Sequence, residues 1–314
     1  MARNSSIRAS CPGSVMILGE HAVLHGRRAL ACAINRRLTV VLAPRTDTRI
    51  QIHSALGDTN AELEDLKPEG PLRFALAALA GQRGRLGHGL DIQIESEFSD
   101  RVGLGSSAAV TVAITAAVHA IAGLAVPPET LHEECLDAIR AVQGIGSGAD
   151  AAASIWGGIV LYRDQPRALR KLPNRCPLTL VYSGYKTPTR DVVLRVEAAR
   201  SKDRQGFERI FDRIDGSVAE AAQAVERRDW ARLGTLLNEN QALMSQMGVS
   251  TPELDDIISQ LRRSPGVLGA KISGSGLGDC ALALGAAAPA DMPYQRIPVQ
   301  ISSQGIHVDQ TRMH

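Results

Sequence analysis

The segment DRVGLGSSAAVTVAITAAVHA, residues 100–120, most constrains the fold of this chain. Two glycines flank Leu104, two serines follow, and an alanine-rich stretch of high helix propensity comes next. Such a loop lets the backbone approach an anion, while free amides and the positive end of the helix dipole point at it. The segment therefore predicts a phosphate-binding loop, although a plain glycine turn with a serine N-cap would have the same sequence.

The two serines of this loop, Ser106 and Ser107, have three chemical uses. They can cap the helix, donate to phosphate oxygens, or offer a hydroxyl oxygen to a magnesium ion. The segment contains neither GKS nor GKT, and no GxGxxG occurs in it, so it is neither a Walker loop nor a Rossmann loop.

Two further segments are also rich in glycine. In QGIGSGADAAASIWGGIVLY, residues 143–162, glycines surround Ser147 and lead to Asp150 at a predicted loop-to-helix junction. Asp150 either caps this helix or orients and deprotonates a substrate hydroxyl. In GAKISGSGLGDCALALG, residues 269–285, glycines lie between two predicted strands, either as a simple turn or as a loop that closes over a nucleotide.

The remaining chain mixes strand and helix patterns. Alternating or continuous apolar runs predict strands at residues 15–18, 38–44, 49–54, 90–98, 157–164, 177–184, 266–274 and 280–285. Helical periodicity and composition predict helices at residues 71–81, 107–124, 189–200, 205–228, 229–247 and 252–263. The pattern changes after Pro173, which places a domain boundary near residue 172. The last ~15 residues fit either a strand or a loose tail.

Charge and cysteine usage exclude several classes of protein. The formal net charge of +2 gives no global field for nucleic acid or an anionic membrane. Five scattered cysteines without CxxC spacing indicate reduced, buried thiols. The amino terminus lacks the apolar core of a signal peptide, and no apolar run approaches the ~20 residues of a membrane span. These features predict a soluble, cytoplasmic protein.

Taken together, the motifs resemble a known family. PGSVMILGEHAV, GLGSSAA and KISGSGLGDC occur in the order of the three motifs of the GHMP kinases, a superfamily of ATP-dependent small-molecule kinases. The resemblance covers nearly the whole chain and implies a two-domain α+β fold. Residues 1–172 would form a domain like the second domain of ribosomal protein S5, with the ATP loop and Asp150, and residues 173–314 a ferredoxin-like domain.

Within the superfamily, GEHAVLHG and the segment NENQALMSQMGVSTPELDDII are similar to mevalonate kinases. This resemblance implies transfer of the ATP γ-phosphoryl group to the C5 hydroxyl of mevalonate, with Mg²⁺ as the metal and a homodimer as the assembly. QGIGSGADAAASIWGG and SGYKTPT are equally similar to phosphomevalonate kinases. A phosphomevalonate kinase, a sugar kinase, and a catalytically silent ligand-binding member of the superfamily are therefore the alternatives.

The resemblance also assigns roles to individual residues. Asp150 matches the catalytic aspartate, and Ser107 matches the magnesium ligand. The predicted nucleotide-binding residues are Gly103, Leu104, Gly105, Ser106, Ser107 and Ala108. The predicted substrate-binding residues are Glu20, His21, Thr189, Gly274 and Ser275, and His21 is expected to donate a hydrogen bond to the substrate.

Two positions depart from the family pattern. Ser14 stands where mevalonate kinases usually have a lysine, and Ile139 stands where a magnesium-binding glutamate is usual, with only Glu134 and Asp137 nearby. A serine supplies no positive charge to the transferring phosphoryl group. Lys186, one of only five lysines, is the predicted replacement cation, or a contact for a phosphate on the substrate, or a solvated loop residue.

Overall fold

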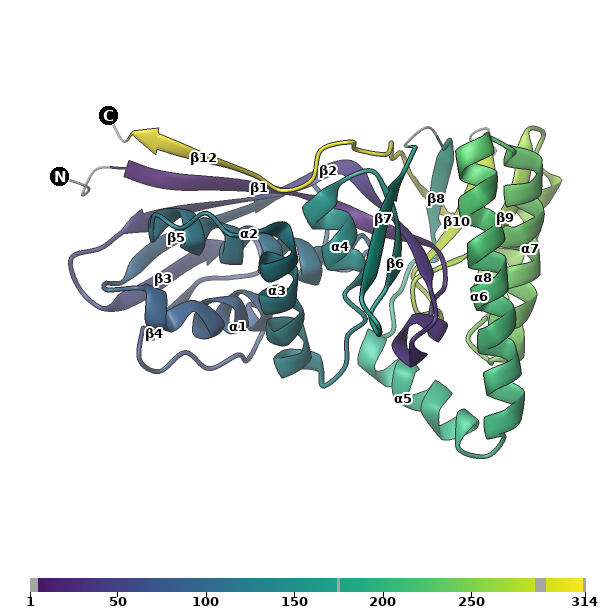
Figure 1. The fold of residues 1–314 in the computed structure, drawn as a ribbon, viewed down its shortest axis with the longest axis horizontal. Coiled ribbons are helices and arrows are strands. Elements are labelled where there is room, and N and C mark those ends of the chain that lie inside the picture. Colours follow the sequence, from purple (N-terminus) through teal and green to yellow (C-terminus); the bar gives the residue numbers. More distant parts are fainter. Residues whose placement is uncertain (1–4, 174–175, 286–291, 313–314) are drawn as a thin grey trace.

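The computed structural model describes residues 5–173, 176–285 and 292–312, which form two β-sheets covered by helices (Figure 1). The first sheet has eight strands: β1 (Ser5–Leu18), β2 (Ala29–Pro44), β3 (Arg49–Ser54), β4 (Thr59–Glu62), β5 (Leu90–Ser96), β6 (Ile159–Arg163), β7 (Ala168–Leu172) and β12 (His307–Arg312). The second has four: β8 (Leu178–Tyr182), β9 (Val267–Ser273), β10 (Cys280–Gly285) and β11 (Gln295–Ile297).

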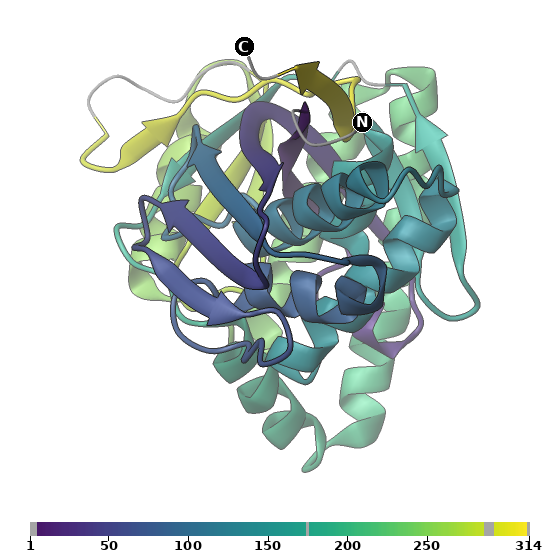
Figure 2. The same cartoon turned by 90° about the vertical axis from the view of Figure 1, so that its left-hand side faces the viewer.

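The first sheet has the order β12-β1-β2-β5-β3-β4, and β6 joins β2 to β7. All pairs in it are antiparallel except β3 with β5. The helices of this half are η1 (Ala22–His25), α1 (Arg73–Gln82), η2 (Arg83–Arg85), α2 (Ser106–Ile121), α3 (Pro128–Gln143) and α4 (Ala149–Trp156). Helices α2 and α4 pack on β1 and β2, and Figure 2 shows the blue and teal helices beside the purple and blue strands.

The second sheet is antiparallel throughout, in the order β11-β8-β10-β9. Its helices are α5 (Thr189–Arg200), α6 (Arg204–Arg227), α7 (Trp230–Gln246) and α8 (Pro252–Arg263). Helices α7 and α8 pack on β9, and α6 packs on α7 and also reaches β2 (Figure 1). Their apolar faces bury leucine, isoleucine, valine and phenylalanine side chains, which is why these long helices form here.

The two halves share one hydrophobic core. Ile17 and Leu18 at the end of β1 are fully buried in the same cluster as Phe211 of α6 and Leu236 of α7. The first half of β1 instead belongs to a separate cluster beneath α1 and α2. Strand β1 therefore carries the residues after it, which include Glu20 and His21, to the boundary between the two halves.

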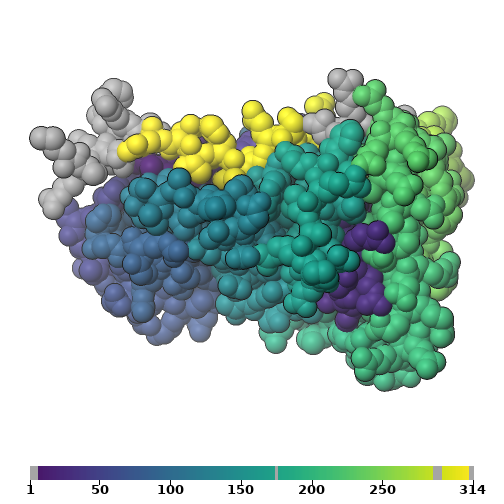
Figure 3. All heavy atoms as spheres, viewed as in Figure 1, coloured from purple at the N-terminus to yellow at the C-terminus, as the bar shows by residue number. Residues whose placement is uncertain are grey.

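The carboxy-terminal residues form a strand, the first of the two predicted possibilities. Strand β12 pairs antiparallel with β1, so that Ile7 lies opposite Gln310. Figure 3 shows this yellow segment running along the surface from the second half of the chain onto the first. The predicted strands and helices are otherwise present. The elements that were not predicted are α3, β4, β7, β11, the short 3-10 helices η1 and η2, and the first halves of β1 and β2.

No helix in the described part of the chain is long and apolar enough to cross a membrane. All five cysteines are buried free thiols, as the sequence predicts. Burial raises the pKa of the Cys11 thiol to about 12, so this thiol stays protonated at neutral pH.

Candidate active site

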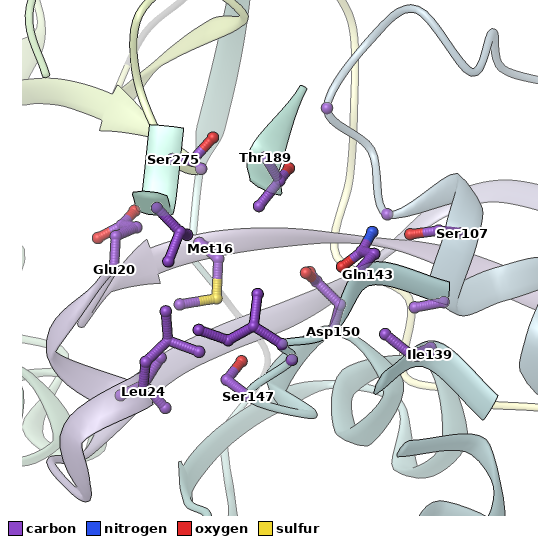
Figure 4. Close-up of a pocket in the computed structure, with 18 of the residues that line it drawn as sticks. Met16, Glu20, Leu24, Ser107, Ile139, Gln143, Ser147, Asp150, Thr189 and Ser275 are labelled. Carbon is purple, nitrogen blue, oxygen red and sulfur yellow. The ribbon is translucent and has the colours of Figure 1, made fainter. Parts of the chain in front are cut away.

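A cavity opens where the glycine-rich segments meet, and it encloses about 1070 Å³ of empty space, including open solvent at its mouth. The three segments contribute Gly103 and Ser107, Ser147 and Asp150, and Gly274. Figure 4 shows Asp150 between Ser107 on one side and Glu20 on the other. A cavity lined by small residues and a few convergent polar groups is suited to a ligand rather than to packing alone.

Asp150 is the second residue of α4, whose N-cap is Gly148 in a left-handed conformation with φ 83°. The N-cap glycine has no side chain, and the first amide of the helix donates to the Ser147 hydroxyl at 3.2 Å, so the alternative role of Asp150 as a cap is not observed. Instead its Oδ1 accepts a hydrogen bond of 2.7 Å from the Ser14 hydroxyl. Among the described residues its Oδ2 has no hydrogen-bond partner, which leaves that oxygen available to a ligand.

Ser14 is fully buried behind this carboxylate. Its amide donates to the carbonyl of Leu104 at 3.0 Å, and its hydroxyl lies so close to Gly105 that a Cβ there would collide with it. Ser14, a residue of strand β1, thus contacts both the phosphate loop and Asp150. The serine at the position of the usual lysine is a hydrogen-bond donor to the aspartate and does not line the cavity.

The phosphate loop leads directly into α2. Its N-cap is Gly105, with φ 68° and no side-chain cap, so the serine N-cap alternative is wrong. Five of the six predicted nucleotide-binding residues line the cavity, namely Gly103, Gly105, Ser106, Ser107 and Ala108. The sixth, Leu104, is 1% exposed and belongs to the hydrophobic core, so its side chain does not reach the cavity. The hydroxyls at the start of α2 therefore stand beside the positive end of the helix dipole.

Lys186 lines the same cavity, in the loop between β8 and α5. Its Nζ lies 3.8 Å from Oδ2 of Asp279, and its side chain is 26% exposed. Burial raises the pKa of Asp150, while the Ser14 hydrogen bond and the positive charge of Lys186 oppose this shift. Lys186 is the one lysine or arginine among the described residues that line the cavity.

The predicted substrate side of the cavity is built around a buried ion pair. Lys271 is 0% exposed, and its Nζ lies 2.5 Å from Oε1 of Glu20. Glu20 Oε2 is buried and has no hydrogen-bond partner among the described residues. The charge of Lys271 compensates one carboxylate oxygen, and the other keeps its capacity to accept a hydrogen bond.

His21 faces the third glycine segment. Its Nε2 lies 2.8 Å from the carbonyl oxygen of Ser275. Burial lowers the pKa of His21, so the ring is neutral at neutral pH, and a carbonyl partner requires the proton on Nε2. His21 Nδ1 therefore remains an acceptor, and the expectation that His21 donates to the substrate is not met because its proton is used by Ser275.

The remaining predicted substrate residues, Thr189 and Gly274, also line the cavity. Thr189 is the first residue of α5, and Gly274 has φ 92°, a conformation that favours glycine. Figure 4 shows Thr189 and Ser275 on the opposite side of the cavity from α4.

The cavity suits a magnesium ion held partly by a nucleotide. The described residues contain no group of three or more His, Cys, Asp or Glu that could hold a metal alone. Mg²⁺ typically takes one or two protein oxygens together with substrate phosphates, and Ser107 and Asp150 offer hard oxygen donors. Ile139 lines the cavity with an apolar side chain. Glu134 points elsewhere, to His119 at 2.5 Å and Arg85 at 2.9 Å, and Asp137 is exposed.

Two residues of this site, Asp279 and Lys271, were not predicted from the sequence. Each had a signal, since Asp279 directly follows the glycine-rich loop and Lys271 is a lysine within an apolar strand. Their partners, Gly103 and Glu20, are 176 and 251 positions away in the chain, and sequence spacing gives no sign of such contacts.

Comparison with known proteins gives three family matches. Residues 72–158 match the GHMP kinases N terminal domain, residues 221–291 match GHMP kinases C terminal, and residues 2–44 match the galactokinase galactose-binding signature.

Curated relatives and solved structures cover nearly all of the chain. It is 33% identical to a mevalonate kinase of Aeropyrum pernix, with 88% of each chain covered. It is 32% identical to a mevalonate kinase of Archaeoglobus fulgidus, with 96% of this chain and 99% of the relative covered. The structure of L. major mevalonate kinase in complex with R-mevalonate superposes with a TM-score of 0.73 at 28% identity, covering 90% of this chain and 87% of the other.

Proposed function

Since this chain belongs to the GHMP kinase family, and its curated relatives are mevalonate kinases, we propose that it transfers the γ-phosphoryl group of ATP to the C5 hydroxyl of mevalonate. The observation that carries this proposal is Asp150, a carboxylate held by Ser14 between the phosphate loop and the Glu20 side of the cavity. A carboxylate in that place can accept the proton of an attacking hydroxyl.

The reaction follows from the placement of these groups. The substrate hydroxyl oxygen attacks the γ-phosphorus, the bond from this phosphorus to the β–γ bridging oxygen breaks, and ADP leaves. Asp150 Oδ1 is occupied by Ser14, so the hydroxyl proton passes to Oδ2. The amides and dipole at the start of α2 stabilise the phosphate charge, and Lys186 adds a positive charge. Mg²⁺, when bound with ATP, neutralises phosphate oxygens, and Ser107 is the residue proposed to hold it.

Charge favours mevalonate over a substrate that already carries a phosphate. Lys186 is the one cationic side chain among the described cavity-lining residues, and it is paired with Asp279. A phosphomevalonate kinase needs further positive charge for the phosphate of its acceptor, in addition to the charge that ATP requires. On the substrate side, His21 is neutral and Lys271 is paired with Glu20, so neither offers a free positive charge to a second phosphate.

The test is ADP release with ATP and three acceptors, namely R-mevalonate, 5-phosphomevalonate and galactose. We expect the highest kcat/KM with R-mevalonate. A preference for 5-phosphomevalonate or galactose would mean that the chain is a phosphomevalonate kinase or a sugar kinase. No ADP release with any acceptor would indicate a catalytically silent member of the family.

Asp150→Asn should lower turnover with R-mevalonate by at least ~10²-fold, the scale of a lost general base, and leave ATP binding intact. Asp212→Asn serves as the matched control, because the Asp212 side chain is 67% exposed and pairs with Arg27 away from the cavity. Unchanged turnover in a folded Asp150→Asn protein would remove Asp150 from the mechanism.

A further inference from the structure

A carboxylate occupies part of the phosphate loop. Asp279 Oδ1 accepts a hydrogen bond of 2.6 Å from the amide of Gly103, the first glycine of GLGSS. The Asp279 side chain lines the cavity and is only 7% exposed. A Cβ on Gly103 would collide with this carboxylate, so the glycine permits the close approach. An amide that could bind a nucleotide phosphate is therefore already bound to a negative charge.

Asp279 is fixed in this place by its backbone. Its amide donates to the carbonyl of Tyr185 at 2.7 Å, and its own carbonyl accepts from the amide of Ser183 at 2.8 Å. Its φ of 71° lies in the left-handed region, which is unfavourable for a residue with a side chain. Gly274, Gly276 and Gly278 in the same loop also have positive φ. A glycine would adopt this backbone conformation without strain. The presence of an aspartate there therefore indicates that its carboxylate has a function that a glycine could not serve.

The charge of Asp279 opposes a bare triphosphate. Lys186 lies 3.8 Å from its other oxygen and supplies a single positive charge, which is shared between Asp279 and any phosphate that enters. A divalent cation removes this conflict, because Mg²⁺ binds carboxylate and phosphate oxygens together. Ser107, on α2, offers a hydroxyl oxygen to the same cavity.

We propose that Asp279 is a ligand for the divalent cation that accompanies ATP in this chain. The carboxylate then makes nucleotide binding depend on the metal, since it attracts the metal complex and repels ATP alone. This inference rests on the proposed function only in that the chain must bind ATP, and it does not depend on which acceptor is phosphorylated.

The experiment measures the coupling between metal and nucleotide without catalysis. ATP binding is titrated by calorimetry in EDTA and in saturating Mg²⁺, for the parent and for Asp279→Asn. Asparagine tolerates the left-handed backbone and keeps an oxygen for Gly103, so this substitution mainly removes the charge. We expect Asp279→Asn to bind ATP alone more tightly and Mg·ATP more weakly, so that the ratio of the two affinities falls at least ~10-fold.

A second readout follows the metal itself. Electron paramagnetic resonance of Mn²⁺ in the presence of ATP should show at least ~10-fold weaker Mn²⁺ binding in Asp279→Asn, because coupling between two ligands is reciprocal. Asp212→Asn should leave both measurements unchanged. If Asp279→Asn does not fold, Asp279→Gly replaces it, since glycine relieves the strained φ.

Three results separate the possibilities. Affinities for ATP and Mg·ATP that change by the same factor, or do not change, would show that Asp279 only supports the loop, and would overturn the inference. Lys186→Met should weaken ATP binding with and without metal, which distinguishes the lysine from a metal ligand. A parent chain that binds ATP under neither condition would contradict the proposed function itself.

Discussion

At the scale of single residues, the contact between Ser14 and Asp150 sets the chemistry of the base. Burial raises the pKa of Asp150, and the hydrogen bond from Ser14 lowers it by stabilising the ionised carboxylate. The charge of Lys186 acts in the same direction as Ser14. The serine therefore takes over one part of the expected role of a lysine, the stabilisation of the carboxylate, while Lys186 supplies the positive charge.

Ser14→Ala should move the acidic limb of the kcat/KM profile to higher pH, by about one pH unit for a lost hydrogen bond to a charged group. The direction of this shift follows from the pKa of Asp150. The reaction needs the ionised carboxylate, its pKa already lies above the ordinary value, and loss of the Ser14 hydrogen bond raises it further. As the pH falls, the Ser14→Ala variant therefore loses activity at a higher pH than the parent.

Ser154→Ala is the matched control for this profile, because Ser154 is a fully buried serine of α4 whose hydroxyl donates to Pro12 and does not touch Asp150. An acidic limb that moves equally in both variants, or in neither, would mean that Ser14 does not tune the base.

Individual site residues could be predicted where the motif itself carries the chemistry. Asp150, Ser107 and Glu20 lie in short glycine-rich phrases, and the structure places all three around one cavity. The contacts between phrases could not be predicted. The Ser14–Asp150 hydrogen bond spans 136 positions, and the use of the His21 proton by Ser275 spans 254. Such contacts depend on how elements far apart in the chain pack together, which local pattern does not encode.

At the scale of elements, helix α2 shows how the backbone builds the phosphate loop. Both ends of the helix have glycines in the left-handed conformation, Gly105 with φ 68° and Gly123 with φ 71°. Only Gly105 is crowded, because a Cβ there would collide with the Ser14 hydroxyl, whereas nothing lies within 4 Å of a Cβ on Gly123. Contact with Ser14 and a left-handed backbone thus both favour glycine at position 105, whereas only the left-handed backbone favours it at position 123.

Gly105→Ala should lower the free energy of unfolding by about 2–4 kcal/mol, through backbone strain together with steric conflict, and should also weaken ATP binding. Gly123→Ala carries the same backbone strain without the conflict, and should cost about 1 kcal/mol with unchanged ATP affinity. Urea unfolding and ATP titration of both variants check this. Equal losses of stability and unaltered ATP binding would show that the contact with Ser14 is unimportant.

Elements with clear periodicity could be predicted, and those that depend on distant partners could not. The alanine-rich α2 and the amphipathic α6 and α8 are evident in the sequence. Strand β1 was predicted only over its apolar end, because its polar first half passes through Pro12 and Gly13 and pairs with β12, about 300 residues further along the chain. The shift of register between Pro12 and Ser14 accommodates the proline within the strand.

At the scale of the whole molecule, β12 protects the edge of the first sheet. It pairs with β1 from Ser5 to Ser10, and Val308 packs against the core of this half. Without β12, the first half of β1 would expose its unpaired backbone groups, and such an edge favours association with other chains.

Removal of residues 307–314 should lower the free energy of unfolding by a few kcal/mol and cause concentration-dependent association. The parent chain is the reference for both measurements. Urea unfolding and light scattering after gel filtration measure both effects, and the same scattering tests the predicted homodimer in the parent. A shortened chain with parental stability and size would show that β12 is dispensable.

The pairing of β1 with β12 also sets an order of events during synthesis. Strand β1 leaves the ribosome about 300 residues before β12, its partner along this edge, so Ile7 cannot pair with Gln310 until late in synthesis. Closing so long a loop is slow, and domains generally begin to fold while the rest of the chain is still being made. The nascent protein therefore carries an open sheet edge until β12 has been synthesised, and its dependence on chaperones should be greatest in the interval before residues 307–312 emerge.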